Sequence, residues 1–214
     1  MANIFDLFKK IESEQQAHAP VSWLLVGLGN PGDKYTFTRH NAGFLAIDYI
    51  SQRLNVKVNR AKFDALVGEA TVGGQGVMLM KPQTYMNESG RAVRQAADFY
   101  KIAPDHIIVL SDDVSLDVGI VRVRKSGSDG GQKGLRSIIY QLNSDGFPRI
   151  KMGVGAKPHP EMDMADWVLS KFTEPEQKLI FDRYTDVFEG VQKIIAGDTD
   201  GAMQICNQIG RAHV

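Results

Sequence analysis

The feature that most constrains the fold is an apolar run that ends abruptly in a glycine-rich turn. Residues 23–28 (WLLVGL) carry no charge and have the length of a strand buried on both faces. The next four residues (GNPG) interrupt regular structure, because glycine and asparagine tolerate turn conformations and proline lacks a backbone donor. A polar loop ending in RHN follows, and residues 44–54 have helical spacing. This order is typical of an open α/β sheet, in which ligands bind at the carboxyl ends of the strands.

The rest of the chain alternates short apolar strands with amphipathic helices. We expect strands at 56–63, 65–71, 77–81, 107–110, 120–124 and 149–155, and further helices at 92–100, 135–142, 173–196 and 199–209. This alternation predicts a single α/β domain with a twisted, mostly parallel (mixed) sheet and helices on both faces. We expect residues 1–22 to form an N-terminal extension, with a short amphipathic helix from Asn3 through Ile11, and residues 23–214 to form the main domain.

Composition excludes several classes of protein. The apolar runs are shorter than the roughly 18 residues that a membrane span needs. Cys206 is the only cysteine, so an internal disulfide or a zinc site of several cysteines is impossible, and we expect a cytoplasmic protein. The net charge is zero, but residues 119–160 hold eight Lys and Arg against two Asp. Such a stretch predicts either a phosphate-binding face or a merely solvated one.

His40 is our candidate general base. Histidine suits proton transfer near neutral pH, and the chain has five. The other four occupy unpromising positions: His18 in the extension, His106 before its strand, His159 between prolines and His213 near the end. A lone histidine is more often structural than catalytic, but position favours this one.

Two carboxylates and two amides lie just after predicted strands or in the loops that follow them. Asp112 and Asp113 follow the apolar strand 107–110, so one of them meets His40 if that strand is the parallel neighbour of 23–28. Capping of a turn is the alternative role for these aspartates. Asn30 and Asn87 can hold a carbonyl, a water or an ester, because an amide donates and accepts without titrating. No Ser or Cys lies in a nucleophile-elbow pattern, which argues against a covalent acyl-enzyme.

The segment GLGNPG also matches the dinucleotide-binding pattern G-x-G-x-x-G. That pattern requires a helix to begin within the glycines, so that its N-terminus meets the pyrophosphate. Here Pro31 and a polar loop delay the helix, and residues 52–62 contain no acid to bind a ribose. A dinucleotide-binding oxidoreductase is therefore the weaker hypothesis.

Taken together, the motifs of residues 23–214 resemble those of the bacterial peptidyl-tRNA hydrolase family. The matching segments are VGLGNPG at 26–32 with Tyr35, TRHNAG at 38–43, KPQTYMNESG at 81–90, Asp112, GGQKGL at 130–135 and GVG at 153–155. The resemblance implies hydrolysis of the ester between the C-terminus of a peptide and the 3′-terminal ribose of tRNA. It implies no metal or cofactor, and we expect a monomer that binds peptidyl-tRNA and no membrane.

The resemblance also implies roles for individual residues. His40 would activate water with Asp112 as its partner, Asn30 and Asn87 would hold the substrate, and Asn41 would support the histidine loop. The candidate substrate-binding residues are Tyr35, Asn41, Met86, Asn87, Gln132 and Lys133. The candidate tRNA-binding residues are Arg122, Arg124, Lys125, Arg136 and Lys151.

The chain departs from the family in the loop at 130–134. The family commonly has GGHNG there, whereas this chain has GGQKG. Gln132 can keep a hydrogen bond but cannot titrate, and Lys133 adds a charge. A non-catalytic RNA-binding relative is the remaining alternative, but such a protein would be expected to have lost His40, Asp112 or Asn30.

Overall fold

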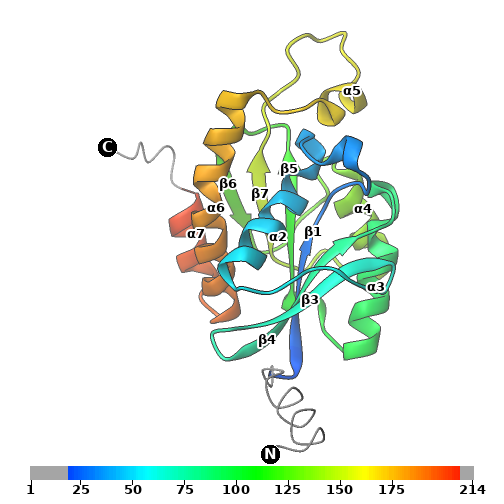
Figure 1. The fold of residues 1–214 in the computed structure, drawn as a ribbon, viewed down its shortest axis with the longest axis vertical. Coiled ribbons are helices and arrows are strands. Elements are labelled where there is room, and N and C mark those ends of the chain that lie inside the picture. The colour runs from blue at the N-terminus through cyan, green and yellow to red at the C-terminus, as the bar shows by residue number, and fades with distance from the viewer. Residues whose placement is uncertain (1–18, 208–214) are drawn as a thin grey trace, which may run out of the picture.

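In the computed structural model, which describes residues 19–207, seven strands form one mixed sheet in the order β2-β3-β4-β1-β5-β7-β6 (Figure 1). The strands are β1 (Val21–Gly27), β2 (Arg60–Lys62), β3 (Ala65–Val72), β4 (Gln75–Pro82), β5 (Ile107–Asp113), β6 (Val121–Arg124) and β7 (Arg149–Gly153). Strands β4, β1, β5 and β7 pair in parallel, and antiparallel pairing is confined to the two sides of this centre. The predicted mixed sheet is confirmed.

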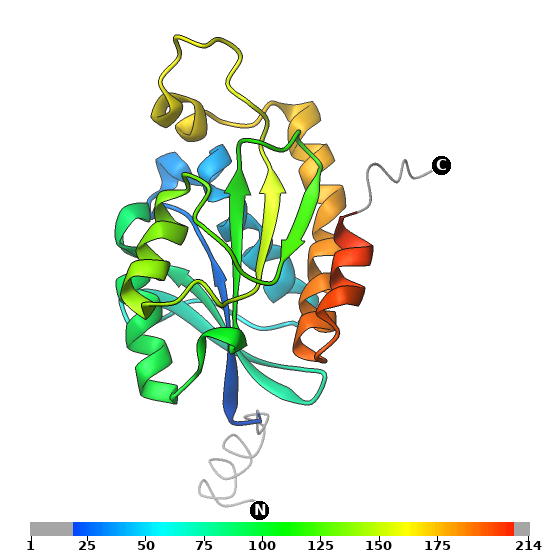
Figure 2. The ribbon, with the colours of Figure 1, turned by 180° about the vertical axis from the view of Figure 1, so that it is seen from behind.

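Helices cover both faces of the sheet, as predicted. They are α2 (Ala42–Arg53), α3 (Ser89–Tyr100), α4 (Lys133–Leu142), α5 (Met164–Leu169), α6 (Glu174–Ile195) and α7 (Thr199–Cys206). Helices α2, α6 and α7 pack on one face around Ile47, Ile150 and Val191, and α3 and α4 pack on the other around Val26 and Ile138 (Figures 1 and 2). No helix within residues 19–207 is long and apolar enough to cross a membrane.

The contact between α2 and the sheet fixes the loop that precedes it. A Cβ atom at Gly43 would lie 2.4 Å from the carbonyl oxygen of Leu110 and 2.4 Å from the backbone nitrogen of Leu28. Only glycine permits so close an approach, because any other residue would collide with the backbone of β5 or with the turn after β1. The start of α2, and the 3₁₀ turn η2 (Arg39–Asn41) before it, are therefore held against the carboxyl ends of β1 and β5.

Several expected boundaries were wrong. Val21 and Ser22 belong to β1 rather than to an extension, and residues 56–59 and 154–155 lie outside the strands. Helix α4 begins at Lys133 because the side chain of Gln132 caps it, and the short helix α5 was not predicted. Neither Asn87 nor Ser89 caps α3, whose preceding residue is Glu88. The expected helix at 3–11, His18 and His213 lie outside the described residues.

Candidate active site

The two central residues of the site meet at the carboxyl end of the sheet. His40 lies in η2 and is 9% exposed, and Asp112 lies near the end of β5 and is 2% exposed. The Nδ1 atom of His40 is 2.8 Å from Oδ2 of Asp112. The ring nitrogen facing an ionised carboxylate carries the proton, so neutral His40 has its lone pair on Nε2. The geometry supplies a base whose ring is oriented by a carboxylate.

The second oxygen of Asp112 is also engaged. Oδ1 accepts a hydrogen bond of 2.9 Å from Nε2 of Gln132. The Oε1 atom of the same amide accepts from the backbone N–H of Leu135 at 2.8 Å and so caps α4. The carboxylate thus lies between His40 and the start of α4.

Asn30 is held so that one donor remains for a ligand. Its Oδ1 accepts from the backbone N–H of Met86 at 2.9 Å, which leaves Nδ2 for the cleft that Asn30 lines. Asn41 fixes the backbone of Asn30 from the other side: its Oδ1 accepts from the Asn30 N–H at 2.9 Å, and its Nδ2 donates to the Asn30 carbonyl at 3.0 Å. An amide in this setting can donate to a carbonyl oxygen.

Asp113 has a different partner. Its Oδ2 accepts from Nζ of Lys151 at 2.8 Å, and its Oδ1 accepts from the backbone N–H and the hydroxyl of Ser115. Burial alone would raise the pKa of Asp113, but the hydrogen bonds from Lys151 and Ser115 outweigh it and lower the pKa below its usual value. Of the two aspartates, Asp112 is therefore the one that contacts His40.

A cleft of about 1290 Å³ opens above the pair. Its walls come from η3 (Met86–Glu88), from α4 and from α5, whose side of the cleft is apolar at Met164 and Val168. The exposed rings of Tyr85 and Tyr140 also line it. The predicted site residues that line the cleft are Asn30, His40, Met86, Asn87, Asp112, Gln132, Lys133, Arg136 and Lys151.

Other candidates lie away from this cleft. Tyr35 lies in η1 (Asp33–Tyr35) and is not among the lining residues, and Asn41 is 2% exposed and contacts Asn30. Arg122 donates to the Asn207 carbonyl after α7, Lys125 pairs with Asp200 in α7, and Arg124 is exposed on the edge strand β6. The structure thus does not place Tyr35, Arg122, Arg124 or Lys125 beside the His40–Asp112 pair, whereas Asn41 follows His40 in η2 and holds the backbone of Asn30.

Arg149 does not belong to the expected basic face. It is 1% exposed, its guanidinium lies 4.2 Å from the centre of the Phe147 ring, and it donates to the carbonyls of Gly127, Ser128 and Asp145. Burial lowers the pKa of Arg149, and nearby Asp145 opposes this. The alternating basic pattern of β7 therefore combines a buried structural arginine with Lys151 in the cleft.

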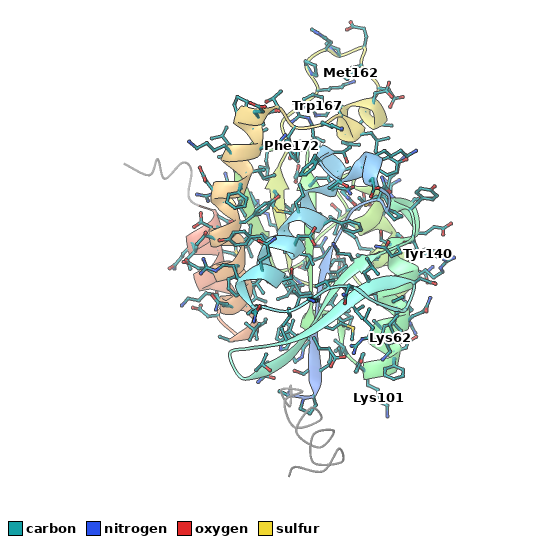
Figure 3. The ribbon with its side chains drawn as sticks, in the orientation of Figure 1. Lys62, Lys101, Tyr140, Met162, Trp167 and Phe172 are labelled. Carbon is teal, nitrogen blue, oxygen red and sulfur yellow. The ribbon has the colours of Figure 1, made fainter. Side chains whose placement is uncertain are left out.

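Arg39 has a structural role that the sequence pattern did not indicate. It is 3% exposed, donates to both carboxylate oxygens of Glu176 at 3.0 and 2.9 Å, and donates to the Val154 carbonyl at 3.0 Å. Its guanidinium lies 3.8 Å from the centre of the Trp167 ring of α5. Figure 3 shows Trp167 and Phe172 below the loop that carries Met162, beside the first turn of α6. Arg39 therefore ties the turn that holds His40 to the wall of the cleft.

Within residues 19–207, no group of three or more His, Cys, Asp or Glu side chains is arranged to hold a metal ion. Cys206 is buried, its thiol donates to the Asp186 carbonyl, and burial raises its pKa to about 12. Such a thiol is a poor nucleophile, because the thiolate is the reactive form. The side chains that meet at the floor of the cleft are the imidazole of His40, the carboxylate of Asp112 and the amide of Gln132.

Comparison with known proteins points to one family. The family model described as peptidyl-tRNA hydrolase matches residues 24–213. A protein named peptidyl-tRNA hydrolase from Caldicellulosiruptor bescii is 48% identical over 187 residues, which are 87% of this chain and 97% of that protein. One of the same name from Clostridium botulinum is 47% identical over 86% of this chain and 95% of its own. The crystal structure of peptidyl-tRNA hydrolase from Acinetobacter baumannii is similar with a TM-score of 0.84 at 32% identity, covering 92% of this chain and all of that one.

Proposed function

Since this chain belongs to the peptidyl-tRNA hydrolase family, we propose that it hydrolyses the ester bond between the C-terminus of a peptide and the 3′-terminal ribose of tRNA. The products are a free peptide and a tRNA that can be charged again. The observation that carries the assignment of residues is the contact of 2.8 Å between His40 Nδ1 and Asp112 Oδ2 at the floor of the cleft. We further propose that the enzyme acts in the cytoplasm as a monomer.

His40 is the general base of the proposed reaction. Its Nε2 accepts a proton from water as the water oxygen attacks the carbonyl carbon of the ester. Asp112 holds the ring and stabilises the imidazolium that forms, and the same proton is then available for the departing ribose oxygen. General acid–base catalysis of this kind contributes about 10² to 10⁴ in rate.

Asn30 acts on the other side of the reacting carbon. Its Oδ1 is occupied by the Met86 N–H, so its Nδ2 donates to the carbonyl oxygen on which negative charge develops. The Asn41 clamp on the Asn30 backbone limits the reorganisation that this donor needs. Asn87 and Met86 line the cleft nearby, where they contact the peptide.

The tRNA approaches along the basic side of the cleft. Lys133, Arg136 and Lys151 line the cleft and attract phosphates of the acceptor end. The exposed rings of Tyr85 and Tyr140 offer surfaces on which unpaired bases stack. Arg122, Arg124 and Lys125, which lie on or next to β6, would contact the backbone of the tRNA outside the cleft.

Release of peptide from purified peptidyl-tRNA tests the proposal against a non-catalytic RNA-binding role. The parent protein should convert the substrate to free peptide and intact tRNA, and His40→Ala should lose most of this activity. His106→Ala is the matched control, since His106 stacks on Trp23 at 4.2 Å at the start of β5, far from the cleft that His40 lines. Binding of the substrate without release of peptide by the parent would refute the hydrolase assignment.

A further inference from the structure

The amide of Gln132 joins the catalytic pair to the first turn of α4. Its Nε2 donates to Asp112 at 2.9 Å, and its Oε1 accepts from the Leu135 N–H at 2.8 Å. The orientation of this amide is unambiguous: a backbone N–H can only donate, so it faces the amide oxygen, and an ionised carboxylate can only accept, so it faces the amide nitrogen. One side chain therefore performs two tasks through two different atoms.

Glutamine is not among the residues that ordinarily cap helices. Ser, Thr, Asp and Asn are favoured at this position, and each is shorter than Gln. The extra length of Gln132 carries its Nε2 to the Asp112 carboxylate while Oε1 still reaches Leu135. A cap alone would not require that length.

Resting on the proposed function, we infer that Gln132 is a positioning residue that acts on His40 through Asp112. Its N–H fixes the carboxylate on the side opposite the imidazole and draws part of the negative charge toward itself. Less negative charge then faces His40 Nδ1, so the carboxylate stabilises the imidazolium less than it would without this hydrogen bond. Because an amide does not titrate, this hydrogen bond persists over the whole pH range of the reaction.

The other charged groups around the pair are already engaged or lie at the cleft wall. Asp113 of β5 is bonded to Lys151 of β7, and Asp129 is paired with Arg136 of α4 at 3.2 Å. Lys133 of α4 is an exposed cation in the same cleft, and Arg39 of η2 is bound to Glu176. Of the described residues, only Gln132 and His40 hydrogen-bond through their side chains to the Asp112 carboxylate.

Two substitutions separate the cap from the contact with Asp112. Gln132→Ser keeps a good N-cap but is too short to reach the carboxylate. Gln132→Glu keeps the length and the cap acceptor but turns a negative oxygen toward Asp112. For peptidyl-tRNA hydrolysis, we expect kcat to fall about tenfold in Gln132→Ser, because the Asp112 carboxylate is no longer fixed in the position that orients His40. We expect the acid limb of the kcat–pH profile to rise in the order parent, Gln132→Ser, Gln132→Glu, with the last more than about one pH unit above the parent.

A second arm shows that the effect passes through Asp112. In an Asp112→Asn background, Gln132→Ser should change kcat by less than about twofold, because the group it acts on is gone. Asp198→Ser is the control, since Asp198 caps α7 by accepting from Gly201 at 2.8 Å and lies outside the cleft. It should leave kcat and the acid limb unchanged, and thermal denaturation of all variants reports whether the fold is retained.

The inference is overturned if the acid limb does not move in Gln132→Glu, or if the loss in Gln132→Ser is the same with and without Asp112. Either result would mean that Gln132 only caps α4 and does not act on His40 through Asp112. Failure of the proposed function would give a different result: a His40→Ala variant that stays active would contradict the role of His40 as general base. If His40→Ala is inactive but the acid limb of the kcat–pH profile does not move in Gln132→Glu, only the proposed role of Gln132 is contradicted.

Discussion

Replacement of Arg39 by lysine should destabilise the protein and slow the reaction while keeping the charge. The guanidinium contacts Glu176 with two nitrogens, the Val154 carbonyl and the Ser170 hydroxyl, and it stacks on Trp167. A lysine ammonium is a single point donor and has no flat face, so it cannot reproduce the paired hydrogen bonds and the stacking together.

The magnitude follows from the contacts that are lost. The loss of one of the two hydrogen bonds to Glu176 and of the hydrogen bond to Val154 should each lower the free energy of unfolding by about 1 kcal/mol. Loss of the stacking on Trp167 adds about 1 kcal/mol, because the side chain of Arg39 is only 4% exposed. The sum of about 3 kcal/mol corresponds to a decrease in Tm of about 6–12 °C for a domain of this size. Since Arg39 directly precedes His40, we also expect kcat to fall by about tenfold or more.

Thermal denaturation and peptide release from peptidyl-tRNA measure the two effects. Arg60→Lys is the matched control, because Arg60 also pairs with a carboxylate, that of Glu69, but its side chain is 57% exposed. An exposed ion pair contributes little to stability, so Arg60→Lys should change the free energy of unfolding by less than about 1 kcal/mol. A decrease in Tm below about 2 °C for Arg39→Lys, or no difference from the control, would refute the reasoning.

Four further variants test the residues around His40 and Arg39. Asp112→Asn should lower kcat by about 10² or more, whereas Asp113→Asn should lower it by less than about tenfold, since only Asp112 contacts His40; the reverse ranking would identify Asp113 as the partner. Burial alone would raise the pKa of Glu176, but the hydrogen bonds from Arg39 and Thr173 outweigh it and lower the pKa below its usual value. Glu176→Gln should therefore reduce the free energy of unfolding above pH 4.5. That deficit should disappear as the pH falls through the lowered folded-state pKa, and a deficit that persists in urea denaturation at lower pH would contradict it. Lys133→Asn should weaken tRNA binding at low salt and reduce the slope of log affinity against log salt by about one, and an unchanged slope would exclude a phosphate contact.

Much of the fold could be predicted because the apolar pattern of the central strands is simple. The run at 23–28 and the run at 107–110 are buried on both faces, and they are parallel neighbours as expected. The start of α4 could not be predicted, because Gln132 is an unusual cap and the glycines before it suggested a longer loop. Helix α5 has only six residues and follows a loop rich in Gly and Pro, so its pattern was too short to recognise.

The site was predicted where chemistry and chain position agreed. His40 remained after elimination of the other histidines, and the end of the strand at 107–110 offered Asp112 or Asp113 as its partner. The family resemblance singled out Asp112, which is the aspartate that contacts His40 in the structure. Arg39 was missed because its partners Val154 and Glu176 lie 115 and 137 residues further along the chain. The bond from Gln132 to Asp112 depends on the cap of α4, which the sequence pattern did not indicate.

The pH dependence of a single turnover of peptidyl-tRNA tests the central claim most directly. With His40 as general base, the log of the rate rises with unit slope at acid pH and levels off once the imidazole is neutral. His40→Ala should be slower by about 10² to 10⁴ at the plateau and should lack that rise. A folded His40→Ala variant within about threefold of the parent rate, equivalent to about 0.65 kcal/mol of barrier, or one that retains the same acid limb, would contradict the claim.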